Sequence, residues 1–455
     1  MKSAYVLVIV CYIALLLAVS LFVARRRSGS SEAYLRASRG LSIPLVSVLI
    51  AGTWTGGVSV VGMAQGAFLH GLSALWFQVG VWIAMFFTAL LLPRIVTGEK
   101  TYSILDVVER LYGKNTARTA GLLQLFFTVW AVAMQMVGGG AILSFILKGS
   151  ISFFMGMCLT ALVFTIYNMV GGLVATAYTN VIHLSITVVG IFLGGLYVIV
   201  SRHGLGGMSG GYYFTPFGDL GAVQALGLTY INFTLSVLAQ PVINTASSAG
   251  SVRQGRTGIV LGSLITIPIV SMAALCGIVA KNAFPHAASL SALPALLDMV
   301  PPSLGALLLL AMWAPLMSSG SPFLMGATTL AVKGFVAPAL HIRTDRGLLL
   351  ASRLTTLGIG LVALVLGLFV KEILRDIAWL AVVMSAVVYV VFFGWAGRIS
   401  SVWAFVSLLG SIVLLFASAV TGLDKVVHPI WPVSAFVFIL MGIGLLRSRR
   451  RKERV

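Results

Sequence analysis

The segment from Pro315 to Pro322 carries a polar pattern with a clear chemical use, because its two prolines enclose Ser318, Ser319 and Ser321. Proline has no amide hydrogen, so Pro315 leaves a carbonyl of the preceding turn without its helical partner. Hydroxyls beside free carbonyls form a neutral, oxygen-rich site that suits a small hard cation such as sodium. The competing interpretation is a kinked helix whose serines bond back to their own backbone.

A second polar segment, residues 52–59, reads Gly-Thr-Trp-Thr-Gly-Gly-Val-Ser. Three glycines and two threonines within so short a stretch weaken a helix. In a membrane, the backbone groups released there need partners, and a cavity that holds an ion or a solute can supply them. Close helix packing through small residues explains the pattern equally well.

The titratable residues indicate which chemistry the interior lacks. All eleven Asp and Glu residues fall in loops or at the ends of apolar stretches, and His183 is the sole imidazole within such a stretch. Proton-driven pumps usually need a buried titratable group, so we expect a structural, hydrogen-bonded His183 more than a proton relay. We find no HExxH, GxSxG or paired-carboxylate motif, and therefore expect no enzyme. Cys11, Cys158 and Cys276 show no metal-ligand spacing.

The composition shows what must position these segments. Hydrophobic residues make up 59% of the 455 residues and charged residues only 9%, against about 25% charged in soluble domains. With a mean hydropathy of +1.05, the chain must be solvated by lipid. The sequence therefore predicts an all-α polytopic membrane protein with a single transmembrane domain over residues 1–455.

A span needs roughly 20 apolar residues, and thirteen stretches qualify. They cover approximately residues 4–24, 42–64, 71–93, 118–147, 152–171, 175–201, 223–249, 257–280, 303–332, 348–370, 377–394, 400–420 and 429–446. The first resembles a cleaved signal in length, but its charges follow the apolar run, so we count it as a span.

The basic residues predict an orientation. The net charge is +19, and with the C-terminus in the cytoplasm 23 of the 30 Lys and Arg residues fall in cytoplasmic segments. This asymmetry obeys the positive-inside rule and places the N-terminus outside. The basic run at residues 447–454 is expected to anchor against anionic lipid rather than to bind nucleic acid.

Several segments taken together resemble the sodium/solute symporter (SSS) family. They are residues 31–42 (SEAYLRASRGLS), 62–67 (GMAQGA), 167–173 (YNMVGGL), 177–183 (AYTNVIH) and 317–319 (MSS). The resemblance covers roughly residues 30–395, and the run Thr53-Trp54-Thr55-Gly56-Gly57 is most similar to the choline-transporter branch.

The resemblance implies a LeuT-type fold, in which two five-helix repeats of opposite topology surround a site at the middle of the membrane. The repeats would cover about residues 42–201 and 223–394, and 4–24, 400–420 and 429–446 would be peripheral helices. It also implies which residues bind. The sodium ligands would be Gly52, Thr55, Pro315, Ser318 and Ser319. The solute would contact Thr53, Trp54, Ser59, Gln78, Gln135, Gln240 and Asn244, and Asn180 and His183 would be candidates for coupling or the inner gate.

The chain departs from the family pattern where acids are usual. Asn180, Ser321 and Gly334 stand at three such positions. A neutral ligand attracts a cation much less than a carboxylate does at low dielectric, so sodium binding could be weak or uncoupled from transport.

The leading hypothesis is sodium-coupled import of a small organic solute, such as an amine or amino acid, across the plasma (inner) membrane of a prokaryotic-type cell. Sodium would be the coupling ion, with no other cofactor, metal, nucleic acid or obligatory protein partner. The alternatives are a sodium-independent or proton-linked carrier or exchanger on the same fold, and a sensor that transports little. A channel is disfavoured because the sequence shows no filter motif.

Overall fold

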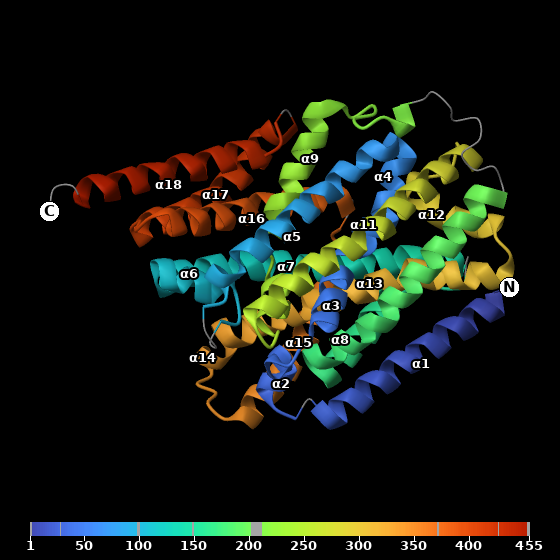
Figure 1. The fold of residues 1–455 in the computed structure, drawn as a ribbon, viewed down its shortest axis with the longest axis horizontal. Helices are drawn as coiled ribbons and strands as arrows, with labels where there is room; N and C mark the ends of the chain where they lie inside the picture. The colour runs from blue at the N-terminus through green and yellow to red at the C-terminus, as the bar shows by residue number, and fades with distance from the viewer. Residues whose placement is uncertain are drawn as a thin grey trace.

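The computed structural model describes residues 2–27, 29–97, 101–147, 150–201, 212–370, 373–425 and 427–452. Across these residues the chain is helical, and its one extended pairing is an isolated bridge between Leu41 and Ala249. Figure 1 shows the helices running roughly side by side in one bundle, with α1 and the α17–α18 pair on opposite sides of it. The prediction of an all-α architecture is confirmed.

The long helices in chain order are α1 (Lys2–Arg27), α3 (Ile43–Trp54), α4 (Met63–His70), α5 (Trp76–Ile95), α7 (Lys114–Ile146), α8 (Phe153–Ser201), α9 (Gly221–Ser236), α10 (Gln240–Ser247), α11 (Val252–Ala283), α13 (Pro302–Ala331), α15 (Asp345–Gly367), α16 (Ile373–Ala396), α17 (Ser401–Thr421) and α18 (Ile430–Lys452). Shorter helices are α2 (Ser31–Arg36), α6 (Ile104–Tyr112), α12 (Ala292–Ala295) and α14 (Ala337–Ala339). Tighter or wider turns form η1 (Ala37–Arg39), η2 (Val58–Gly62), η3 (Gly71–Leu75), η4 (Tyr212–Phe214), η5 (Ser289–Ser291), η6 (Leu296–Met299), η7 (Val332–Val336) and η8 (Leu423–Lys425).

The number of membrane crossings depends on how bent helices are divided. Each of the thirteen predicted stretches falls mainly on helical residues, although 42–64 and 223–249 contain breaks. By length and apolarity alone, nine helices of the described chain could cross a membrane, or ten if the bent pair α9–α10 is one span. Of the nine, the run 153–200 covers two predicted spans, and the run 58–95 covers the predicted span 71–93 together with the end of 42–64. A multi-pass membrane protein is therefore supported, and the count of thirteen stays a prediction.

Helix α8 is a hairpin rather than one long rod. Residues 167 and 183 of a straight helix would be about 24 Å apart at 1.5 Å per residue, yet the Tyr167 hydroxyl lies 3.3 Å from Nε2 of His183. The chain reverses at Gly172, whose φ of 60° favours glycine. A Cβ there would also lie 2.5 Å from the Tyr34 carbonyl. This turn separates the predicted spans 152–171 and 175–201.

Helix α13 forms the centre of the bundle (Figure 1). Every residue from 311 to 332 is buried, and a helix buried on all sides belongs to a core. It packs against α8, α7 and α3. The serine-rich segment therefore lies in a fully buried part of the bundle.

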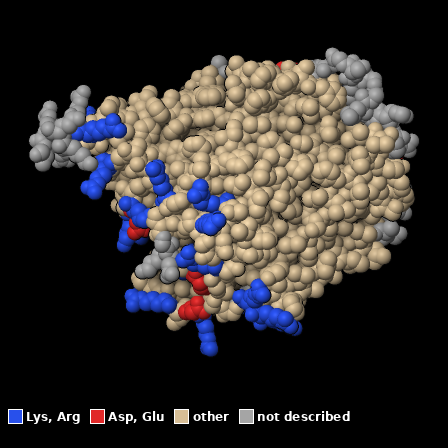
Figure 2. Space-filling model, viewed as in Figure 1, with Lys and Arg blue, Asp and Glu red and all other residues tan. Residues whose placement is uncertain are grey.

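Basic side chains gather at one end of the helices. On the face seen in Figure 2, the Lys and Arg side chains lie on the left and lower left, and the surface to their right is almost entirely tan. This agrees with the grouping of charges that the sequence predicted. Which end faces the cytoplasm stays a prediction.

Candidate functional site

The helix that begins at Ile43 breaks within the glycine-rich segment. Helix α3 ends at Trp54, and Thr55 has φ −109° and ψ 39°, outside the helical region. The chain bends at Thr55 and Gly56 and is helical again at Gly57, before the wide turn η2 starts at Val58. The predicted weak point is a true break, and it leaves main-chain groups of this segment free for other partners.

Helix α13 packs directly against this break because glycines there have no side chain. A Cβ on Gly56 would lie 2.5 Å from the Ser319 hydroxyl, and one on Gly52 would lie 2.5 Å from Nδ2 of Asn180. Real Cβ atoms do not approach so closely. The small residues therefore serve close packing, and they also bring the carbonyls of α3 to the serines of α13.

Five oxygen atoms meet at this contact. The Ser318 hydroxyl lies 3.3 Å from the Gly52 carbonyl oxygen and 2.9 Å from the Pro315 carbonyl oxygen. The Ser319 hydroxyl donates to the Thr53 carbonyl at 2.8 Å. Ser318 and Ser319 are nearly fully buried. Carbonyl and hydroxyl oxygens are ligands that hard cations prefer, so this arrangement could hold a cation once the hydroxyls turn their lone pairs inward.

The structure brings Gly52, Pro315, Ser318 and Ser319 together, as the resemblance implied. Thr55 is also buried in the break, but its hydroxyl donates to the Ala51 carbonyl at 2.8 Å. The Thr53 carbonyl joins the cluster, whereas the Thr53 hydroxyl bonds back to Leu49 at 2.7 Å. A sequence does not show which carbonyl faces a neighbouring helix, so this oxygen could not be chosen beforehand.

Asn180 on α8 lies directly behind the oxygen cluster. Its Nδ2 donates to the Ser318 carbonyl at 3.1 Å, while its Oδ1 is buried without a hydrogen-bond partner in the described chain. An unpaired buried carbonyl oxygen is costly. Oδ1 is thus one more neutral oxygen available near the cluster.

A small cavity of about 40 Å³ adjoins the cluster on the other side of the break. Its lining residues come from α3, the break, η2, α5, α7, α9 and α13; they are Thr53, Trp54, Gly56, Val58, Ser59, Phe77, Gln78, Val81, Phe127, Ala131, Gln135, Asn232, Leu235, Ser319 and Phe323. This space holds only a few water molecules, so the site is nearly closed in this conformation.

The polar atoms of the cavity are partly unpaired. The Ser59 hydroxyl donates to Oε1 of Gln78 at 3.1 Å, and Oε1 of Gln135 accepts from the Gly57 amide at 3.0 Å. Nε2 of Gln78 and Nε1 of Trp54 are buried and without a partner among the described residues. Both are hydrogen-bond donors, so a bound solute with an acceptor atom would satisfy them.

Aromatic rings form much of the remaining wall. Trp54 packs edge-on against Phe323 with 6.2 Å between ring centroids, and Phe127 packs against Phe323 at 6.1 Å. Phe77 is the fourth ring. Phe77, Phe127, Phe323 and Asn232 were not predictable from the sequence, because an apolar or amide residue on a membrane helix gives no sign of whether it faces a cavity.

The structure leaves Gln240 and Asn244 outside the cavity lining. Oε1 of Gln240 accepts from the Ile104 amide at 3.1 Å, and its Nε2 donates to the Tyr102 carbonyl at 3.3 Å. Gln240 thereby ties α10 to the start of α6. The side-chain amide of Asn244 is buried and has no partner in the described chain.

His183 belongs to a buried hydrogen-bonded chain that joins three helices. Tyr12 of α1 contacts Nδ1, the Tyr167 hydroxyl lies 3.3 Å from Nε2, and Tyr167 also contacts the Ser321 hydroxyl, which donates to the Met317 carbonyl at 2.8 Å. Every hydrogen finds an acceptor if Tyr12 donates to Nδ1 and Nε2–H donates to Tyr167. This arrangement holds α13 just beside the serine pair and corresponds to a neutral ring.

Polar and charged side chains close the basic end of the bundle. The Tyr102 hydroxyl donates to Glu32 at 2.6 Å, and the cations of Arg36 and Lys333 lie 4.3 and 4.4 Å from the centre of its ring. The buried Arg36 also donates to the Ser247 carbonyl at 2.8 Å. Burial raises the pKa of the Tyr102 hydroxyl, so it remains a donor at neutral pH.

Hollows lie at the opposite end, along η2 and α4. One of about 210 Å³ shares Val58 and Phe77 with the cavity and extends past Gly66 to His70. A second, of about 90 Å³, reaches from Gly57 to Gln65. The cavity thus neighbours open space on the α4 side and is sealed on the side of α2 and α6.

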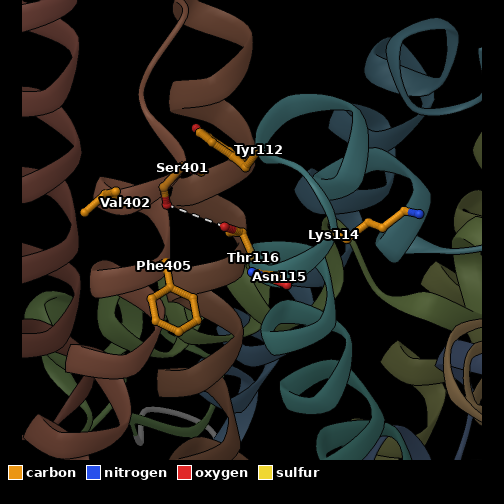
Figure 3. Close-up of a pocket in the computed structure, with 7 residues that line it drawn as sticks. All are labelled: Tyr112, Lys114, Asn115, Thr116, Ser401, Val402 and Phe405. Atoms are coloured by element: carbon orange, nitrogen blue, oxygen red, sulfur yellow. Dashed lines mark hydrogen bonds between the residues drawn. The ribbon is translucent and has the colours of Figure 1, made fainter.

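A larger hollow of about 530 Å³, between α6, α7 and α17, is not part of this site. Figure 3 shows Thr116 bonded to the Ser401 carbonyl, while Lys114 points away from Phe405 and the rest of the lining. No charged group is directed into it, so it offers no recognition chemistry comparable to the cavity.

The fold and the site define a multi-pass membrane protein built like a secondary transporter. A solved Na+-coupled sialic acid symporter, captured in a substrate-bound outward-open state, superposes with a TM-score of 0.79 over 97% of both chains, at 15% sequence identity. A model of the sodium:solute symporter family matches residues 34–212. The predicted resemblance to this family, and its LeuT-like fold, are confirmed.

Curated relatives match part of the chain. The human "High affinity choline transporter 1" is 26% identical over 193 residues, which are 41% of this chain and 33% of that protein. The "Uncharacterized symporter YwcA" of Bacillus subtilis is 22% identical over 233 residues, covering 51% of this chain and 44% of that protein. The matches thus span between a third and a half of these relatives' lengths.

Proposed function

We propose that this protein is a secondary active transporter that imports a small organic solute together with sodium. The observation that carries the proposal is the contact between the hydroxyls of Ser318 and Ser319 and the carbonyls of the broken helix α3. Broken helices beside a midplane site are how transporters of this architecture bind their cargo.

The chemistry of the oxygen cluster favours a monovalent cation. Its members are the Gly52, Thr53 and Pro315 carbonyls and two hydroxyls, so it carries no formal charge. A divalent ion loses more hydration energy on entering such a site than neutral oxygens return. Sodium, as a co-transported ion, fits this balance and would bind with modest affinity.

A proton is the less suitable coupling ion. In the buried chain described above, every hydrogen finds an acceptor when Nδ1 of His183 accepts from Tyr12 and Nε2–H donates to Tyr167. A second ring proton would require Tyr12 to turn its hydroxyl away from Nδ1, breaking a buried hydrogen bond. We therefore assign His183 a structural role rather than a proton relay.

The solute class follows from the cavity wall. Four aromatic rings surround the space and no side chain of its lining is charged. Aromatic faces attract organic cations without a counter-charge, and the free donors of Trp54 and Gln78 can bind a hydroxyl or carboxylate. A small methylated ammonium compound meets both requirements, which agrees with the choline transporters among the relatives. The cavity must open further to admit it.

Alternating access would use the two ends of the bundle differently. The hollows along α4 would form the outer entrance, and the Tyr102 cluster would be the closed inner gate. In this account residues 42–201 and 223–394 are the two repeats within one transmembrane domain, the N-terminus lies outside, and the C-terminus lies in the cytoplasm of a prokaryotic-type cell. The basic side chains at one end of the bundle support this orientation.

A sodium-independent carrier on the same fold is the second candidate, because of Asn180, Ser321 and Gly334. At Gly334 a Cβ would lie 2.4 Å from Cδ1 of Leu105, so an acid there would require the Leu105 side chain to move.

A thermal-shift screen of the purified protein separates the candidates. We would measure unfolding temperature with choline, betaine, amino acids, sugars and carboxylates, each in sodium and in potassium. Sodium coupling predicts that a methylated ammonium compound stabilises the protein only when sodium is present. Equal shifts in both salts would support the sodium-independent carrier, and no shift with any solute would favour a sensor.

A further inference from the structure

A lipid-facing groove with a basic rim lies between α5 and α11. It measures about 420 Å³ and is lined by Phe86, Ala89, Leu90, Arg253, Arg256, Thr257, Val260 and Leu261. It is separate from the solute cavity, since the two share no lining residue. The groove is therefore a second, distinct feature of the protein.

The groove has two chemically different ends. Helix α11 starts at Val252, so Arg253 and Arg256 lie in its first two turns, and Val260 and Leu261 follow deeper in the span. On α5, which runs the opposite way, Leu90 is 64% exposed and Phe86 39%. A Cβ on Gly255 would lie 2.9 Å from Leu92. Gly255 of α11 and Leu92 of α5 are therefore in close contact, side by side. The groove thus leads from two guanidinium groups into an apolar trough.

The two arginines are not neutralised by the protein. Both are exposed, and neither forms an ion pair or hydrogen bond within the residues that the structure describes. They are three residues apart on one helix and therefore neighbours on its surface. Arg94 stands four residues beyond Leu90 on α5, at the same basic end, and is exposed as well.

We propose that this groove binds one anionic glycerophospholipid, with its phosphate between Arg253 and Arg256 and an acyl chain along Phe86, Leu90 and Leu261. Guanidinium groups bind phosphate oxygens through paired hydrogen bonds, and the acyl chain gains contact with apolar side chains on both walls. α5 ends and α11 begins at this end of the groove, and Lys and Arg side chains gather toward one edge of the molecule in Figure 2, which is where lipid head groups would lie. The proposal does not depend on what the protein transports.

Native mass spectrometry of the purified full chain tests this proposal. The protein would be titrated with dioleoyl phosphatidylglycerol, dioleoyl phosphatidylcholine and glycerol 3-phosphate. We expect one phosphatidylglycerol to bind at least tenfold more tightly than phosphatidylcholine, and glycerol 3-phosphate, which has no acyl chain, to bind far more weakly. Binding of phosphatidylcholine or glycerol 3-phosphate as tight as that of phosphatidylglycerol would overturn the proposal.

Matched variants identify the site. Arg253→Gln plus Arg256→Gln should weaken the tight phosphatidylglycerol about thirtyfold, at about 1 kcal/mol for each arginine near an anionic lipid. Arg343→Gln plus Arg346→Gln removes the same charge with the same spacing from an exposed segment outside the groove and should leave binding unchanged.

A third variant tests the trough without changing charge. Leu261→Trp fills it from a lipid-exposed position (Leu261 is 42% exposed) and should also weaken the tight lipid. Unchanged lipid binding in both the arginine double variant and Leu261→Trp would show that the groove is not a lipid site. A second copy of the chain bound there in place of the lipid would show the same.

Discussion

The hydroxyl of Ser319 donates a 2.8 Å hydrogen bond to the main-chain carbonyl of Thr53, a residue 266 positions earlier in the chain. This bond joins the central helix α13 to the point where α3 breaks. Because the broken segment has no regular helical partners there, its carbonyls are available to the serines. They could also bind a cation once the serine hydroxyl hydrogens turn away from them.

Removal of both hydroxyls should weaken sodium binding. Ser318→Ala plus Ser319→Ala deletes two of five oxygens, so we expect the sodium concentration for half-maximal uptake to rise at least about tenfold. The matched control is Ser407→Ala plus Ser411→Ala, a buried pair on the peripheral helix α17. Unaltered sodium dependence in the first variant would refute the assignment of the cation site.

A carboxylate at position 180 should strengthen cation binding. Asn180 already lies against the Ser318 carbonyl, and a negative charge in so enclosed a place attracts a cation strongly. We expect Asn180→Asp to lower the half-saturating sodium concentration by about tenfold, as read from uptake or thermal-shift titrations. Asn115→Asp, at an exposed position, serves as the control for the added charge. If Asn180→Asp leaves sodium affinity where it was, the cation binds elsewhere.

A methyl group at the break should block the close approach of α13. Gly56→Ala places a Cβ 2.5 Å from the Ser319 hydroxyl, and overpacking of this kind costs about 1–3 kcal/mol. The expected result is a lower unfolding temperature together with loss of uptake. Gly358→Ala on α15, where no atom lies within 4 Å of the added carbon, should change neither quantity. Equal behaviour of the two variants would contradict the packing described here.

Loss of one hydroxyl at the basic end should favour the inward-open state. Tyr102→Phe keeps the ring but removes the 2.6 Å bond to Glu32, worth roughly 1.5–3 kcal/mol because the acceptor is charged. Ser247 is buried, and its carbonyl accepts a hydrogen bond from Arg36. A cysteine at this position should then react with a soluble thiol reagent about tenfold faster, in a background without native cysteines.

The control for this experiment is Tyr112→Phe, which removes a 2.8 Å bond to the Val390 carbonyl at the same end. It should leave the labelling rate unchanged. If Tyr102→Phe labels no faster than this control, the Tyr102 cluster does not hold the inner end closed.

Features that depend on local sequence were predictable. The break after Trp54 follows from glycine and threonine propensities, and Ser318 and Ser319 were recognisable because prolines bracket them. The reversal at Gly172 was visible only as a gap between two apolar stretches. The bend between α9 and α10, 48° in size, also had a local signal, since Pro241 has no amide hydrogen to continue the helical bonding of the preceding turn.

Features that depend on how helices meet could not be predicted. Gln240 has the same amide as Gln78 and Gln135, yet it bonds to Tyr102 and Ile104 instead of facing the cavity. Phe323 lines the cavity although it looks like any apolar residue of a span. The rotation of each helix about its own axis within the bundle decides which side chains face the cavity. Composition alone does not reveal that rotation.

The central claim is that an inward sodium gradient drives solute uptake through the site between α3 and α13. The most direct test is accumulation of radiolabelled choline by purified protein in proteoliposomes, with sodium or an equal concentration of potassium outside. The account predicts at least tenfold more accumulation with sodium, and loss of this difference in Ser318→Ala plus Ser319→Ala. Equal accumulation in the two salts, or a sodium effect that survives in this variant, would contradict it.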